Sequence, residues 1–100
     1  MKYNKLVRDR IPEIIKEKGG NPVTHIADDA EYWTKLKEKL TEEVKEFLES
    51  ETEEELADIE EVLKTIYEYR NIDPAKIEAL RKKKSEERGG FKNKIILDES

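Results

Sequence analysis

The chain has 100 residues and a formal net charge of −5, and 45% of its residues are charged. This length fits one domain, which we expect to span residues 1–100. With no cysteine and a single histidine, the chain cannot form disulfides, thiolate metal sites or any site that needs two imidazole groups.

The composition also limits which partners the protein can bind and where in the cell we expect it. The acidic balance argues against nonspecific binding to nucleic acid. No apolar run approaches the roughly 18 residues that a membrane span requires. Charges interrupt the first twenty positions, so no secretory signal is visible, and we expect a cytoplasmic protein.

The first predicted element is a short helix from about Arg8 to Lys18, in which three isoleucines follow helical spacing. Pro12 is tolerated only in the first turn, and Gly19-Gly20 ends the helix. Residues 22–27 then form a short extended segment that we interpret as a strand.

Two longer helices follow. Asp28 or Asp29 caps the first of them, which runs to about Ser50. Thr52 caps the next, which reaches about Arg70. Because the turn between these helices is short, they should pack as an antiparallel hairpin.

A fourth helix begins at Asp73-Pro74, which supplies an N-cap carboxylate and a proline at the first helical position, and ends at Gly89-Gly90. Residues 91–98 are a second candidate strand, which could pair with residues 22–27 because a lone strand leaves its backbone groups unpaired. We therefore expect a mainly α fold: a helical hairpin that forms a four-helix bundle on oligomerisation, with a short two-stranded β element.

Acidic residues stand where apolar side chains are expected. On a helical wheel, Glu43 projects within the apolar stripe of the second helix, Glu46 lies at the edge of that stripe, and Glu42 faces solvent. The third helix repeats the pattern, with Glu55 inside its stripe and Asp58 at the edge. Since residues three apart are neighbours on a helix surface, two acid pairs should point into one region of the hairpin.

Four carboxylates in one region repel one another, and burial of an unpaired one costs several kcal/mol. The two stripes contain no arginine or lysine, so a divalent metal is the economical counter-charge. Ligands that are all oxygen favour hard cations such as Mg²⁺ or Mn²⁺. Mg²⁺ completes its shell with water and substrate phosphate, which favours metal-assisted hydrolysis of a phosphoanhydride.

A structural interpretation competes with this one. Thr52-x-x-Glu55 matches a capping box, in which Glu55 would only cap its own helix. The chain could then be a noncatalytic helical module that uses its stripes for oligomerisation or partner binding. Such a seam should prefer apolar residues at Glu43 and Glu55, which favours the enzyme.

The acidic motifs resemble those of a known family. Glu42-Glu43-Val44-Lys45-Glu46, followed by Glu55-Leu56-Ala57-Asp58, is similar to the EExxE…ExxD signature of the all-α nucleotide pyrophosphohydrolases, the MazG-like superfamily. Residues 3–15 look like the opening of a small phosphoribosyl-ATP pyrophosphohydrolase-like branch, and Arg88-Gly89-Gly90-Phe91 with the tail 95–97 looks like its ending. The resemblance covers nearly the whole chain. One departure is the short spacing between the two halves, residues 47–54.

The resemblance implies cleavage of a nucleoside triphosphate, or a phosphoribosyl-nucleotide triphosphate, to monophosphate and pyrophosphate. It implies Mg²⁺ as the cofactor, and the donor set made only of oxygen atoms would also suit Mn²⁺. It also implies that four acids are the metal ligands and catalytic residues: Glu43, Glu46, Glu55 and Asp58.

Three cations are candidates for binding the substrate. Lys5 and Arg8 precede the first helix, and Arg88 adjoins Gly89-Gly90. An arginine fork or a lysine near the metal would suit a triphosphate tail. Solvent exposure or salt bridging is the alternative interpretation of each.

The chain should also bind a second copy of itself. Both central helices carry apolar stripes wider than one hairpin can cover. The surplus, which includes Leu48, Leu63 and Tyr67, needs another surface. We expect a homodimer or a tetramer, an assembly that the family resemblance also implies.

Overall fold

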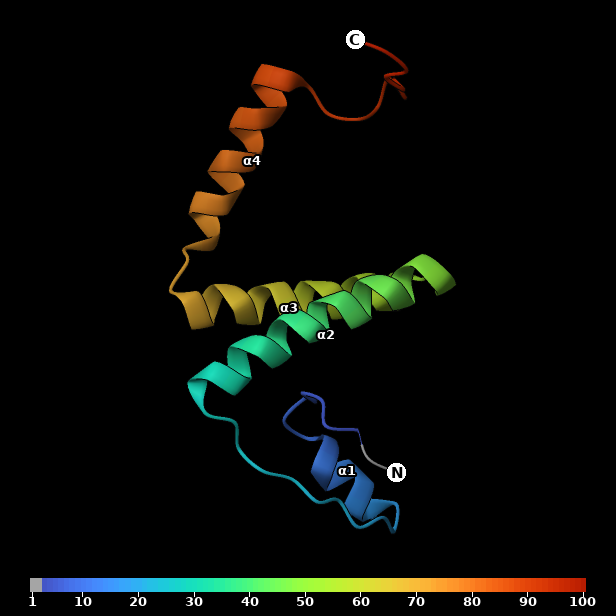
Figure 1. The fold of residues 1–100 in the computed structure, drawn as a ribbon, viewed down its shortest axis with the longest axis vertical. Helices are drawn as coiled ribbons and strands as arrows, with labels where there is room; N and C mark the ends of the chain where they lie inside the picture. Colours follow the sequence, from blue (N-terminus) through green and yellow to red (C-terminus); the bar gives the residue numbers. More distant parts are fainter. Residues whose placement is uncertain (1–2) are drawn as a thin grey trace. The chain divides into compact units, whose positions relative to one another are not determined.

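The computed structural model describes residues 3–100, and in these residues the regular structure is helical (Figure 1). The all-α class and the order of four helices are confirmed. The first helix begins at Ile11, close to the predicted start, and Pro12 lies in its first turn as expected. The helices are α1 (Ile11–Glu17), α2 (Asp29–Ser50), α3 (Glu53–Arg70) and α4 (Pro74–Arg88).

The chain divides into two compact units, one up to Leu63 and the other from Lys64 onward. The first unit contains α1, α2 and the beginning of α3. The side chain of Asp28 accepts a hydrogen bond from the backbone N–H of Glu31 (2.8 Å), which fixes the start of α2. At the other end of α2, Glu51 adopts a left-handed conformation (φ 56°), and the chain turns directly into α3.

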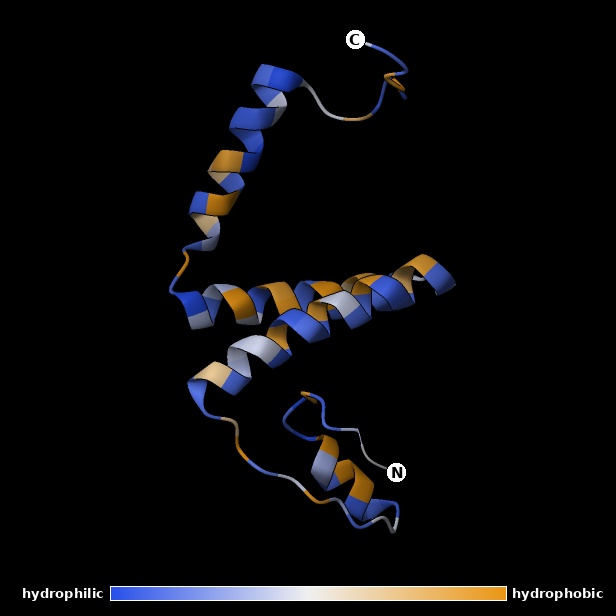
Figure 2. Ribbon diagram, in the orientation of Figure 1, coloured by the Kyte–Doolittle hydropathy of each residue, from blue (hydrophilic) through white to orange (hydrophobic). Residues whose placement is uncertain are grey.

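The apolar core of the first unit is very small. Leu36 and Val62, at 1% and 7% exposure, are the buried hydrophobic residues of the part of the chain that the structure describes. Apolar positions alternate closely with charged ones along the helices (Figure 2). The acidic residue Glu43 is also buried, at 5% exposure. The least exposed positions of the hairpin are therefore occupied by two apolar side chains and one carboxylate.

The second unit contains the end of α3, α4 and the segment that follows it. Asp73 caps α4 through a bond from the backbone N–H of Ala75 (2.9 Å), with Pro74 in the first turn. Gly89, at φ 81°, ends the helix. These boundaries agree with the sequence prediction, because proline and an N-cap carboxylate mark a helix start and glycine marks its end.

The predicted β element is wrong. Neither 22–27 nor 91–98 forms a strand in the described residues. Val23 and Ile26 are 94% and 95% exposed, and Ile95 is 81% exposed, so neither apolar run is buried against a partner. An extended segment becomes a strand only when a neighbour satisfies its backbone groups, and an apolar run in the sequence does not supply that neighbour.

Among the described residues, none of the helices has the length and apolar character needed to cross a membrane.

Candidate functional site

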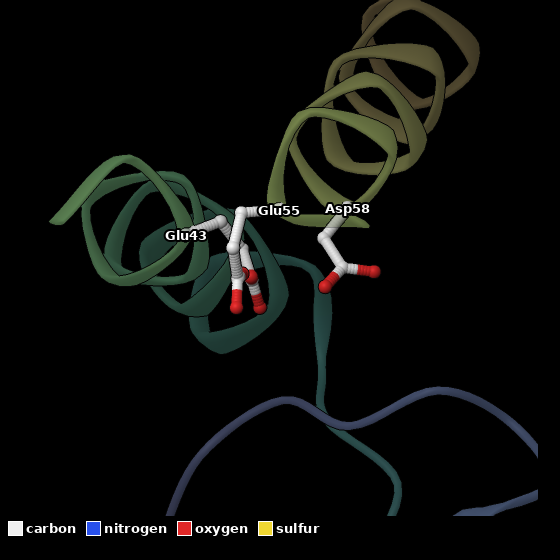
Figure 3. Close-up of side chains that lie close together, drawn as sticks. All are labelled: Glu43, Glu55 and Asp58. Carbon is white, nitrogen blue, oxygen red and sulfur yellow. The ribbon is translucent and has the colours of Figure 1, made fainter. Parts of the chain in front are cut away.

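Three of the predicted acids come together in the first unit. Glu43 on α2 and Glu55 and Asp58 on α3 each place a carboxylate oxygen within 4.8 Å of the other two. Figure 3 shows the carboxyl groups of Glu43 and Glu55 side by side, with Asp58 next to them on the same side of the hairpin. The short connection at Glu51 makes this possible, because it folds the start of α3 back along α2.

The environment of this acidic cluster (Glu43, Glu55 and Asp58) is unusual for carboxylates. Glu43 is buried, and its Oε2 atom has no hydrogen-bond partner in the described structure. Glu55 Oε2 is likewise buried and unpartnered. A buried oxygen without a partner carries a desolvation penalty of about 1–3 kcal/mol, and more when it is charged. Two such atoms in one cluster leave oxygen lone pairs available to a cation or to a proton shared among the acids.

Glu46 lies beside the cluster. Burial, together with the negative charges of Glu43 and then of Glu55, raises the pKa of Glu46 from its usual range to about 7. The carboxyl groups of Glu46, Glu43 and Glu55 therefore act on one another directly. A proton retained on Glu46 lowers the repulsion within the group near neutral pH.

Lysine and arginine side chains surround the acids. Arg8 Nη2 donates to Asp58 Oδ1 at 2.8 Å, and Lys5 Nζ lies 3.2 Å from Glu42 Oε1. The N-terminal segment therefore brings both predicted phosphate-binding cations to the edge of the site. Glu42, predicted to face solvent, is half-buried and also lies 3.7 Å from Lys39 Nζ, so that prediction needs correction.

Lys39 is a site residue that sequence reasoning missed. Its Nζ lies 3.2 Å from Glu43 Oε1, and its side chain is 18% exposed. The helical wheel excluded lysine from the apolar stripe, but a long side chain can reach a neighbour one turn away. The signal was the i, i+4 spacing between Lys39 and Glu43.

Arg88 belongs to the second unit, where it ends α4 and is exposed.

The donor set fits a hard divalent cation. All the available ligand atoms are carboxylate oxygens, which Mg²⁺ and Mn²⁺ prefer. The capping interpretation of Glu55 accounts for only part of the geometry. Its backbone N–H does reach Thr52 Oγ1 at 3.4 Å, but its Oε2 is left buried and unpartnered beside Glu43.

Comparison with known proteins gives little functional information. No family model matches the chain, and no solved structure matches it. A protein of Mycolicibacterium smegmatis (strain ATCC 700084 / mc(2)155), described only as uncharacterized, is 51% identical over 47 residues. The match covers 47% of this chain and 48% of that protein, so about half the length of the relative is spanned.

The raised pKa of Glu46 predicts how stability depends on pH in the metal-free chain. Since the folded state holds this proton more tightly than the unfolded state, the contribution of Glu46 to the free energy of unfolding is complete below pH 4.5 and is lost as the pH rises to about 7. One such group gives a slope of at most about 1.4 kcal/mol per pH unit. Denaturant unfolding in chelator, from pH 4.5 to 8, should show a flatter profile for Glu46→Gln. Identical profiles would contradict this assignment.

Proposed function

We propose that the chain is a metal-dependent nucleotide pyrophosphohydrolase of the MazG-like kind, in the small phosphoribosyl-ATP pyrophosphohydrolase-like branch. The observation that carries the proposal is the convergence of Glu43, Glu55 and Asp58, with two buried oxygens left unpartnered. The reaction is hydrolysis of a nucleoside triphosphate, or a phosphoribosyl-nucleotide triphosphate, to monophosphate and pyrophosphate.

In this proposal Glu43, Glu55 and Asp58 hold Mg²⁺, or Mn²⁺ in its place, and Glu46 is the fourth acid of the site. When bound, the ion shields the charge of the phosphates and lowers the pKa of water. The four acids are thus the catalytic residues of the proposal, and the EExxE…ExxD resemblance implies Glu46 as a fourth metal ligand.

The cations of the N-terminal segment bind the phosphates. Arg8 presents a guanidinium group that can donate two parallel hydrogen bonds to phosphate oxygens, and Lys5 adds a point charge. In the structure, Arg8 forms an ion pair with Asp58, and Lys5 forms one with Glu42. Binding of a triphosphate gives both cations a more highly charged partner. Arg88, in the second unit, is a third candidate from the resemblance.

Glu46 is suited to proton transfer. A general base must lie within reach of the water that it deprotonates, and Glu46 lies beside Glu43 and Glu55 at the proposed metal site. Its carboxylate takes the proton of the attacking water as the new P–O bond forms. The bridging P–O bond breaks, and pyrophosphate leaves.

Self-association is the second part of the proposal. Three large apolar side chains on α2 and α3 are exposed, namely Val44 (38%), Leu48 (69%) and Leu56 (45%). With so few buried hydrophobic residues in the described chain, covering this surface would add substantially to stability. A second copy, in a homodimer or tetramer, would cover it by twofold symmetry. A noncatalytic oligomerisation module would share this surface, and assays of turnover separate the two functions.

Turnover should depend on the buried acid. Pyrophosphate release is measured over a panel of nucleoside triphosphates with Mg²⁺, with Mn²⁺ and with chelator. Changes to residues that only support metal ligands cost about 10- to 100-fold in activity, so loss of a ligand in Glu43→Gln should exceed about 100-fold in kcat/KM. Asp58→Asn should behave in the same way.

Glu42→Gln is the matched control, because it removes the same charge from the adjacent residue and should be milder. Equal losses at Glu42 and Glu43 would contradict the ligand assignment. A wild-type chain with no metal-dependent pyrophosphate release on any nucleotide would refute the enzyme and favour the oligomerisation module.

Assembly has its own test. Light scattering at micromolar concentration should give at least a dimer for the wild type. Leu48→Glu should shift the mass toward the monomer, because it places a charge in the covered surface. The control is Leu97→Glu, which changes an exposed leucine of the C-terminal segment and should leave the mass unchanged. A well-folded wild-type monomer would overturn this part of the proposal.

A further inference from the structure

The two oxygens of Glu43 have different surroundings. Oε1 lies 3.2 Å from the ammonium group of Lys39. Oε2 is buried and has no partner in the described structure. The side chain as a whole is 7% exposed, so water has little access to either oxygen. One oxygen of this carboxylate is therefore engaged, and the other is left for a ligand.

The position of Lys39 allows it to hold Oε1 of Glu43 and leave Oε2 free of a lysine contact. It lies one turn before Glu43 on α2, and its side chain is itself only 18% exposed. Its Nζ is also 3.7 Å from Glu42 Oε2, so it has acidic partners on two sides.

We propose that Lys39 is a positioning residue that determines which divalent cation the acidic cluster accepts. By holding Oε1, it leaves Glu43 able to offer one oxygen to the ion. Ca²⁺ takes 6–8 oxygen ligands and often binds both oxygens of a carboxylate, whereas Mg²⁺ demands a compact octahedral shell. A carboxylate restricted to one oxygen therefore favours the smaller ions over Ca²⁺. The inference rests on the proposed metal site and adds the origin of its selectivity.

The test compares two ions rather than one affinity. Calorimetric titration of the full chain with Mn²⁺ and with Ca²⁺, without nucleotide, gives a dissociation constant for each. Removal of a positive charge strengthens the binding of both ions by Coulomb attraction, and because both are divalent this effect largely cancels in the ratio. In Lys39→Met, the preference for Mn²⁺ over Ca²⁺ should fall roughly tenfold, the lower end of the change in affinity that follows loss of an outer-shell partner.

Lys35→Met is the matched control. Lys35 lies one turn earlier on α2, its side chain is 20% exposed, and it pairs with Glu38 at 3.1 Å rather than with the cluster. Lys35→Met removes the same charge from a side chain that is almost equally buried. The ratio of the Mn²⁺ and Ca²⁺ dissociation constants should therefore stay at the wild-type value. Lys39→Gln is a second variant that should reproduce Lys39→Met if the methionine variant does not fold.

The outcomes separate this inference from the proposed function. An unchanged ratio in the folded Lys39 variant overturns the inference, and so does an equal shift in Lys35→Met. If Mn²⁺ binds the wild type but not Glu43→Gln, the metal site stands whatever the Lys39 variants show. If the wild type binds neither ion, or Glu43→Gln binds Mn²⁺ as the wild type does, the metal site fails and the role of Lys39 fails with it.

Discussion

Repulsion among carboxylates is the constraint on which the rest of this structure depends. The connection at Glu51 folds the start of α3 back on α2 and brings one carboxylate oxygen each of Glu43, Glu55 and Asp58 within 4.8 Å of one another. Charges at that spacing interact strongly when water is excluded. The chain compensates in part with its own cations, through Lys39 on Glu43 and Arg8 on Asp58. Two buried oxygens remain without partners.

The acidic cluster also limits the stability of the fold. Leu36 and Val62 are the buried hydrophobic residues of the described part of the chain, and Glu43 takes a position that a hydrophobic residue could have filled. Replacing a buried charge with a well-packed apolar group is often neutral or stabilising. If this position served packing alone, an apolar residue in place of Glu43 would be at least as stable. This is the physical argument that favours a binding role over an oligomerisation seam.

Sequence reasoning predicted the helices well where a local signal fixes the boundary. Asp28 and Asp73 cap the helices that they were expected to cap. The helical wheel placed Glu43 inside because burial follows the period of a helix. It missed the contact of Lys39, since a wheel records the direction of a side chain and not its reach. The β element failed because strand formation depends on a partner that no local pattern identifies.

The central claim is that the acidic cluster is built to hold a divalent cation, and thermal unfolding tests it most directly. An ion that binds the folded chain alone raises Tm with concentration, and removal of a ligand abolishes the rise. Wild type and Glu55→Gln are compared in chelator and in millimolar Mn²⁺ at one pH. The account predicts a clear, chelator-reversible increase in Tm for the wild type and little or none for Glu55→Gln. No increase in the wild type, or an equal increase in both, would contradict it.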